Sequence, residues 1–400
     1  MLGTHATTPA GRQAGDNPRM NRAPAPLAGL KVLELGQLIA GPFAGRMLGD
    51  FGADVIKVEP PGNGDPLRQW RLLHDGTSVW WQVQSRNKRS VVLDLRTDEG
   101  RAGVRALARE ADVLIENFKP GTLEKWGLGP DQLTHDNPGL VMLRISGYGQ
   151  TGPYRDLPGF AVVAEAMGGL RHLMGEPGRV PVRAGVSLGD TLAGLHGVIG
   201  VLMALQARAR DGRGQVVDVA LYEAVFNCME SLLPEYSAFG AIRQPAGSAL
   251  PGIAPSNAYR CADGQVVIGG NGDSIYKRLM ASIGRDDLGQ DTALASNAQR
   301  AARADELDAA ITAWTVQRPV NEVVATLQAS SVPVGRIYTV KDIAEDPHFQ
   351  ARGMLQDAAT PDGLALKVPG VVPRLSATPG RLERPAPRLG EHDGQGFDAD

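Results

Sequence analysis

The sequence predicts an α/β protein with a Rossmann-like parallel sheet in a large domain and a second, smaller α/β domain. Two observations carry this prediction. Short apolar runs alternate with helical segments over the first 150 residues, and strands that alternate with helices favour a doubly wound parallel sheet. The 400 residues also contain 50 glycines and 28 prolines without a repeat, which indicates many tight turns in a globular chain.

Five apolar runs bounded by turn residues are predicted strands, and they are KVLELG (31–36), ADVIKVE (53–59), SVVLDL (90–95), DVLIENF (112–118) and LVMLRIS (140–146). A further strand is predicted in QVVDVAL, after a long helical segment. Ligands bind at the carboxyl ends of parallel strands. We therefore expect the loops GQLIAGP, NFKPG and SGYGQTGP to line a site.

Shifts in composition divide the chain into four parts. Residues 1–26 are small, polar and proline-rich, and they are predicted to be a disordered extension. Residues 27–225 form the large domain. Residues 226–330 form the small one, which includes a predicted hairpin turning at Asp263-Gly264. Residues 331–400 are predicted to return to the large domain and to end as an extended tail.

Composition disfavours several classes of protein. The net charge of −3 does not indicate nucleic acid or a membrane surface as a partner. Cys228 and Cys261 have no disulfide-framework or metal spacing, so we predict no metal and a cytoplasmic location. We find no uninterrupted apolar run of ~18 residues and no signal-peptide core. Gly36, Gly41 and Gly45 do not match GxGxxG, which disfavours an NAD-dependent oxidoreductase.

One acid, Asp190, stands among small and apolar residues in GVSLGDTLAGLHG (185–197). It can be the N-cap of the helix that follows, because Asp is a favoured capping residue. It can also be a catalytic carboxylate that small neighbours leave open to a substrate. The residues of this stretch alone leave both interpretations open.

Nine segments in order, from about Leu27 to about His392, resemble the family III CoA-transferases. They include PLAGLKVLELGQLIAGPF, ADVLIENFKPG, RISGYGQTGPY, GVSLGDTLAG and DGRGQVVDVALYEA. The family includes formyl-CoA transferase, carnitine CoA-transferase and α-methylacyl-CoA racemase. The resemblance implies an interlocked homodimer, each chain threading through the other. It also implies CoA thioesters and carboxylic acids as substrates, with no tightly bound cofactor.

The resemblance implies that Asp190 is the nucleophile, because the family's aspartate stands in a segment like GxxxGDxxxG. It would attack the thioester carbonyl of an acyl-CoA to give a mixed anhydride and then an aspartyl-CoA thioester. Such a carboxylate must be ionised near neutral pH, and we expect the helix N-terminus to lower its pKa. The backbone N–H of Gly189 is our hypothesis for the oxyanion donor.

Positions that match the CoA contacts of formyl-CoA transferase are Ile39, Ala40, Leu93, Arg96, Asn117, Phe118, Lys119 and Lys125. The cations among them would pair with phosphates, and Phe118 would pack on the adenine. The alternative is that the charges are ordinary surface and that Phe118 is core. Pro60-Pro61 replaces a basic residue of some relatives. The chain has glycine pairs but does not repeat the longer glycine run of formyl-CoA transferase, so a glycine lid is not predicted.

Two other functions stay open. Racemisation of a 2-methylacyl-CoA needs two acid–base groups at the α-carbon, but Phe160 stands where the racemases carry histidine. A non-catalytic CoA-binding protein is the second. The predicted substrates, succinyl-CoA and a small dicarboxylate, rest on likeness to the glutarate, itaconate and citramalate transferases of the family. Arg71, Arg171 and Arg183 are candidates to bind the second carboxylate.

Overall fold

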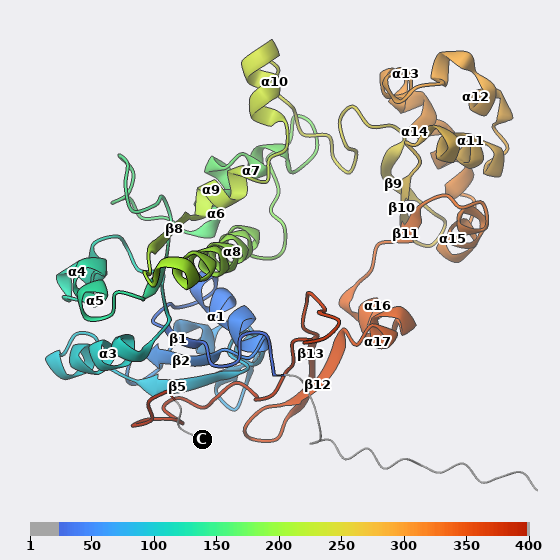
Figure 1. Cartoon of the computed structure of the whole chain (residues 1–400). Coiled ribbons are helices and arrows are strands. Elements are labelled where there is room, and N and C mark those ends of the chain that lie inside the picture. The colour runs from blue at the N-terminus through green and yellow to red at the C-terminus, as the bar shows by residue number, and fades with distance from the viewer. Residues whose placement is uncertain (1–23, 398–400) are drawn as a thin grey trace, which may run out of the picture.

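The computed structural model describes residues 24–397, and its centre is a six-stranded parallel sheet (Figure 1). The strand order is β5-β2-β1-β6-β7-β8. The strands are β1 (Lys31–Glu34), β2 (Asp54–Glu59), β5 (Lys88–Val92), β6 (Val113–Glu116), β7 (Val141–Ser146) and β8 (Val216–Ala220). All six were predicted as strands. Most of the predicted N-terminal extension, residues 1–23, lies outside the described residues.

The strand order places a topological switch point between β1 and β6. The chain moves outward in one direction from β1 through β2 to β5, and in the other from β6 through β7 to β8. The carboxyl ends of the two central strands diverge at such a point, and ligands of doubly wound sheets bind there. We therefore expect a ligand site at the loops that follow β1 and β6.

Helices cover both faces of the sheet because alternate strand residues point to opposite faces. Val32 packs in one buried cluster with α1 (Ala40–Asp50) and α8 (Leu188–Asp211). Its neighbour Leu33 packs in another with α3 (Asp98–Glu110). The shorter elements here are η1 (Pro66–Gln69), β3 (Leu73–His74), β4 (Thr77–Ser78), α2 (Val79–Gln84), α4 (Thr122–Lys125), α5 (Pro130–Asp136), α6 (Ala161–Met167), α7 (Leu170–Leu173), α9 (Leu221–Phe226) and α10 (Leu232–Phe239).

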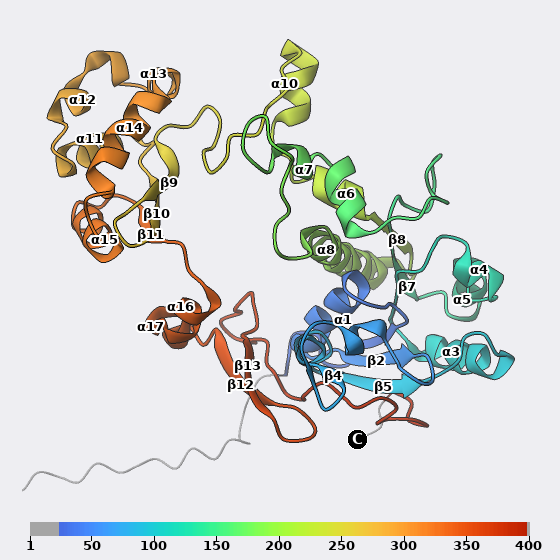
Figure 2. The same ribbon diagram turned by 180° about the vertical axis from the view of Figure 1, so that it is seen from behind.

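A second unit has its own buried core and stands apart from the six-stranded sheet in both views (Figures 1 and 2). Its antiparallel sheet has the order β11-β10-β9, and the predicted hairpin at Asp263-Gly264 is confirmed. Its elements are β9 (Ser256–Arg260), β10 (Gln265–Gly269), α11 (Asp273–Ser282), α12 (Asp286–Gln290), η2 (Thr292–Leu294), α13 (Asn297–Ala302), α14 (Ala304–Thr315), α15 (Val320–Ala329) and β11 (Val334–Arg336).

The last segment of the chain returns to the large sheet as α16 (Val340–Glu345), α17 (Pro347–Ala351), a hairpin of β12 (Leu355–Ala359) and β13 (Ala365–Pro369), and an extended stretch. In that stretch the His392 N–H donates to the Ser90 carbonyl at 3.0 Å. Phe397 is buried in the core beside α3. The tail is thus part of the core of the large unit.

By length and composition α8 could cross a membrane, which corrects the expectation that no segment would pass this test. Polar residues spread along it interrupt the apolar run in the sequence. In the fold α8 packs against α1, β7 and β8. It is therefore a partly buried core helix.

Candidate active site

Asp190 lies in a cavity of about 660 Å³ at the carboxyl ends of the central strands. The loops after β1 and β6, the end of β7, the start of α6 and the start of α8 line this cavity. The lining residues include Gln37, Leu38, Ile39, Ala40, Trp70, Arg71, Trp80, Asn117, Phe118, Ser146, Phe160, Arg183, Ser187 and Asp190. The switch point and the sequence thus lead to the same place.

Asp190 stands in the first turn of α8, but Ser187 is the N-cap of this helix. The interpretation of Asp190 as the N-cap is therefore wrong. Burial and then the charge of Glu165 raise the pKa of Asp190 to about 6, although the Arg183 charge lowers it. We expected a lowered pKa, and the correction has a physical reason: the loss of solvation outweighs the helix N-terminus. The carboxylate is still mostly ionised at pH 7.

Glu165 on α6 is a site residue that the sequence analysis missed. Its side chain is 2% exposed and accepts hydrogen bonds from Arg171 Nη2 at 2.7 Å and from the Gly189 N–H at 3.3 Å. Arg183 Nε lies 3.6 Å from the same carboxylate. A lone acid between apolar residues in PGFAVVAEAMGG, like Asp190 in its own segment, was the available signal.

The hydrogen bond from Gly189 bears on the oxyanion hypothesis. In this structure the Gly189 N–H is already donated to the Glu165 carboxylate. A thioester oxygen would have to displace that acceptor before this donor could stabilise it. The oxyanion role of Gly189 therefore stays a prediction, and it requires this hydrogen bond to break.

Asn117 holds the loop after β1 against the cavity. Its Oδ1 accepts from the Gln37 N–H at 2.7 Å, and its Nδ2 donates to the Gln37 carbonyl at 2.8 Å. A Cβ at Gly36 would lie 3.1 Å from that Oδ1 and 3.3 Å from the Gly41 Cα, so only glycine fits this approach without a shift. Asn117 therefore positions Ile39 and the residues next to it.

A buried network of ion pairs also holds the loop after β1 in place. Lys57 Nζ contacts Glu34 at 3.0 Å and Asp65 at 2.8 Å, and Lys88 Nζ contacts Glu34 at 2.8 Å. Burial disfavours the Lys57 charge, but the two carboxylates outweigh it and raise the pKa of Lys57. Asp65 also accepts the Leu38 N–H at 3.1 Å. These charges are paired, so they fix the loop rather than offer a further reactive group.

The predicted CoA contacts fall into two sets. Ile39, Ala40, Asn117 and Phe118 line the cavity with Asp190. The other four do not line this cavity in the described part of the chain, and they are Leu93, Arg96, Lys119 and Lys125. Leu93 is half-buried beside α3, Arg96 pairs with Asp94 at 2.8 Å, and Lys119 and Lys125 are exposed.

Aromatic side chains form part of the cavity wall. Phe118 lines the cavity and also packs edge-on against Trp126 at 5.4 Å, so the core and binding interpretations both apply. Trp70 and Trp80 lie 6.1 Å apart between ring centroids, and the Arg71 guanidinium lies 5.0 Å from the Trp80 ring. Phe160, which replaces the histidine of the racemases, is exposed to the cavity.

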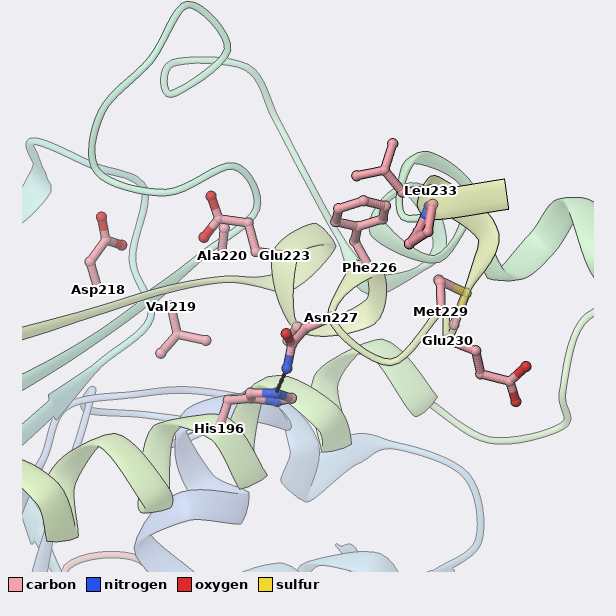
Figure 3. Close-up of a pocket in the computed structure, with 12 residues that line it drawn as sticks. His196, Asp218, Val219, Ala220, Glu223, Phe226, Asn227, Met229, Glu230 and Leu233 are labelled. Atoms are coloured by element: carbon pink, nitrogen blue, oxygen red, sulfur yellow. Dashed lines mark hydrogen bonds between the residues drawn. The ribbon is translucent and has the colours of Figure 1, made fainter. Parts of the chain in front are cut away.

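A second cavity of about 610 Å³ lies beside α9 and α10 (Figure 3). His196 Nε2 and Asn227 Nδ2 meet there at 3.0 Å, and Asp218 and Glu223 stand nearby (Figure 3). Asp190 is not one of its lining residues. Within residues 24–397, no group of three or more His, Cys, Asp or Glu residues is placed to hold a metal ion.

Comparisons with known proteins identify the family of the chain. Residues 27–393 match the model of CoA-transferase family III. The chain is 49% identical over 378 residues to a succinyl-CoA–D-citramalate CoA-transferase of Chloroflexus aurantiacus, covering 94% of each chain. It is 38% identical to a succinate–glutarate CoA-transferase of Agrobacterium fabrum, covering 94% of this chain and 95% of that one.

A solved structure shows the same fold. The crystal structure of a CAIB/BAIF family protein from Brucella suis matches with a TM-score of 0.82 and 39% identity, covering 92% of this chain and 98% of that chain. The family model spans the whole six-stranded sheet, the second unit and most of the returning tail. The chain therefore belongs to CoA-transferase family III and is a CoA-transferase.

Proposed function

We propose that this enzyme transfers CoA from succinyl-CoA to a small dicarboxylate, with Asp190 as the nucleophile. The observation that carries the proposal is a half-buried carboxylate beside an arginine in the cavity at the switch point. The 49% identity to a succinyl-CoA–D-citramalate CoA-transferase supports the choice of substrates.

The chemistry follows from the Asp190 carboxylate. One of its oxygens attacks the thioester carbonyl, and the C–S bond breaks. The CoA thiolate departs, and the succinyl and aspartyl groups are then joined as a mixed anhydride. The thiolate then attacks the aspartyl carbonyl and releases succinate, which gives an aspartyl-CoA thioester. The incoming carboxylate repeats these two steps in reverse. One thioester replaces another, so the exchange is nearly balanced in free energy.

The positions of the remaining predicted residues suggest how CoA is held. Ile39, Ala40 and Phe118 would contact the CoA chain inside the cavity, and Asn117 would hold the loop that carries Ile39 and Ala40. Lys119 and Lys125, which are exposed, would pair with phosphates outside it. Leu93 and Arg96 are further predicted CoA contacts, and Gly189 is the predicted oxyanion donor.

Racemisation is the alternative within the family. Phe160 lines the cavity where a proton carrier would be needed, and a phenyl ring cannot transfer a proton. Transfer attacks only the carbonyl carbon, so a chiral 2-methylacyl-CoA incubated in deuterated water should keep its α-hydrogen. Rapid deuterium uptake at that carbon would favour the racemase instead.

We also propose that the enzyme is a cytoplasmic homodimer, interlocked as the resemblance implies. Large apolar side chains stay exposed along α8, α9 and α10 of the single chain, namely Ile199, Leu202, Met203, Phe226, Leu233 and Phe239. A soluble monomer rarely exposes so many neighbouring apolar groups. A second copy of this chain would cover them.

The test is a panel of acids incubated with the enzyme and succinyl-CoA, with acyl-CoA products identified by mass spectrometry. Citramalate, malate, glutarate and mesaconate are the dicarboxylates to include, and butyrate is the monocarboxylate control. We expect new thioesters from one or more dicarboxylates and little from butyrate. Transfer to butyrate alone, or to no acid, would contradict the proposal.

A further inference from the structure

We propose that Arg183 binds the second carboxylate of the dicarboxylate substrate and so determines the preference for dicarboxylates. This inference rests on the proposed function, because it assigns a specificity residue within the same cavity. Arg183 precedes α8 by five residues and lines the cavity together with Asp190. A guanidinium presents two parallel N–H groups that fit a carboxylate.

The contacts of Arg183 leave its donors available. Its Nε lies 3.6 Å from Glu165 Oε2, which is longer than a charged hydrogen bond of about 2.7–2.9 Å. Arg171 already holds the same oxygen at 2.7 Å. The buried Glu165 charge is thus compensated by Arg171, whereas the side chain of Arg183 stays 43% exposed.

The charges of this cluster change during the reaction. Before reaction, Arg171 and Arg183 balance Glu165 and Asp190. When the Asp190 carboxylate becomes an anhydride or a thioester it loses its charge, and the cluster is left with one excess positive charge. In the anhydride both reacting carboxyl groups are acylated, so the distal carboxylate of a dicarboxylate is the charged group of the acid that remains, and Arg183 would pair with it. A monocarboxylate offers no such group beyond its reacting end.

The two other candidate arginines fit this role less well. Arg171 is engaged with Glu165 and is not among the residues that line this cavity. Arg71 does line it, but its guanidinium lies over the Trp80 ring at 5.0 Å, beside Trp70. The Trp80 ring therefore already engages the charge of Arg71.

The test compares two isotope exchanges that need no second acid: succinyl-CoA with labelled succinate, and butyryl-CoA with labelled butyrate. The pairs differ mainly in a terminal carboxylate against a methyl group. Arg183→Gln also removes a charge that lowers the pKa of Asp190, which affects both exchanges equally, so the readout is the ratio of the two. We expect kcat/KM of the succinyl exchange to fall at least ~30-fold further than that of the butyryl exchange. Arg183→Lys keeps the positive charge but not the planar guanidinium, so its succinyl exchange should be intermediate between those of the wild type and Arg183→Gln.

Arg179→Gln is the matched control, because Arg179 lies exposed in the same loop and does not line the cavity. It should change neither exchange. Equal losses of both exchanges in Arg183→Gln, or an unchanged succinyl exchange, would overturn the inference. If the wild-type enzyme exchanges neither acid, the proposed function itself fails. Should Arg183→Gln not fold, the Arg183→Lys variant decides by the same comparison.

Discussion

As the proposed nucleophile, Asp190 has to be ionised, but its environment disfavours the ionised form. Burial and the Glu165 charge raise its pKa to about 6, and the protonated form is not a nucleophile. We therefore expect kcat/KM for succinyl-CoA to fall as pH drops through about 6 and to level off above about 7. Initial rates between pH 5 and 8 test this. A profile flat down to pH 5 would indicate an Asp190 pKa near the ordinary value of about 3.9.

Asn117 acts through the loop that it holds. Asn117→Ala removes both hydrogen bonds to the half-buried backbone of Gln37, at a cost of about 1 kcal/mol of unfolding free energy for each bond. We expect KM for acyl-CoA to rise because Ile39 and Ala40 lose their fixed position. Denaturant unfolding and steady-state kinetics measure the two effects. Asn117→Asp keeps the oxygen that accepts the Gln37 N–H and should therefore lose less unfolding free energy than Asn117→Ala. A larger loss in Asn117→Asp than in Asn117→Ala would contradict this account.

At the scale of elements, the contact between α1 and α8 sets the width of the site. Each helix begins at the cavity: Ala40 starts α1 and Asp190 lies in the first turn of α8. Gly194 permits the close packing, since a Cβ there would lie 2.8 Å from the Phe43 ring and 3.0 Å from the Ala40 carbonyl. The spacing of the two helices thus fixes Asp190, the proposed nucleophile, relative to the loop after β1.

Gly194→Ala tests this packing. Alanine favours a helix over glycine, yet we expect a loss of about 1–3 kcal/mol because the helices must separate. Transfer activity should fall with it. Thermal unfolding and exchange rates measure both. Gly185→Ala is the control, because a Cβ there meets no atom within 4 Å; an equal effect at the two positions would exclude the packing explanation.

Local signals predicted some elements and missed others. The six sheet strands were found because each coincides with a short apolar run near turn residues. β7 (VMLRIS) is buried throughout, and β8 (VVDVA) was found by its apolar residues although its first three residues are not buried. The β12–β13 hairpin was missed because its strands, LQDAA and ALKVP, are short and contain a single fully buried residue, Val368, between them. Glu165 was missed for a different reason. Its role depends on Arg171 and on the backbone of Gly189, and only the tertiary fold brings these groups together.

At the scale of the whole molecule, the single chain presents apolar surface that a second copy would cover. Phe239 is 84% exposed and Met203 is 67% exposed. We expect an obligate dimer that persists on dilution, because threaded chains cannot separate without unfolding. Sedimentation and activity at nanomolar concentration measure this. A folded, active monomer under those conditions would contradict the interlocked arrangement.

Replacing Asp190 with asparagine should abolish transfer activity and at the same time raise the free energy of unfolding. Its raised pKa means that the folded state binds the proton more tightly than the unfolded state, so the side chain favours folding at low pH and loses that contribution as pH rises through about 6. Asp190→Asn removes this buried charge. The variant should be folded at pH 7.5 and more stable than the wild type by about 1–3 kcal/mol, with the difference vanishing near pH 4.

The most direct measurement of the central claim is chemical trapping of Asp190 during turnover. Anhydride and thioester carbonyls react with hydroxylamine, but a free carboxylate does not. Wild-type enzyme treated with succinyl-CoA and hydroxylamine should lose activity and carry a hydroxamate in the peptide containing GVSLGD, as located by mass spectrometry. Asp190→Asn should show neither the mark nor more than about a thousandth of the wild-type transfer, a difference of ~4 kcal/mol. A mark on another residue, or an Asn variant that keeps more than a tenth of the activity, would contradict the account.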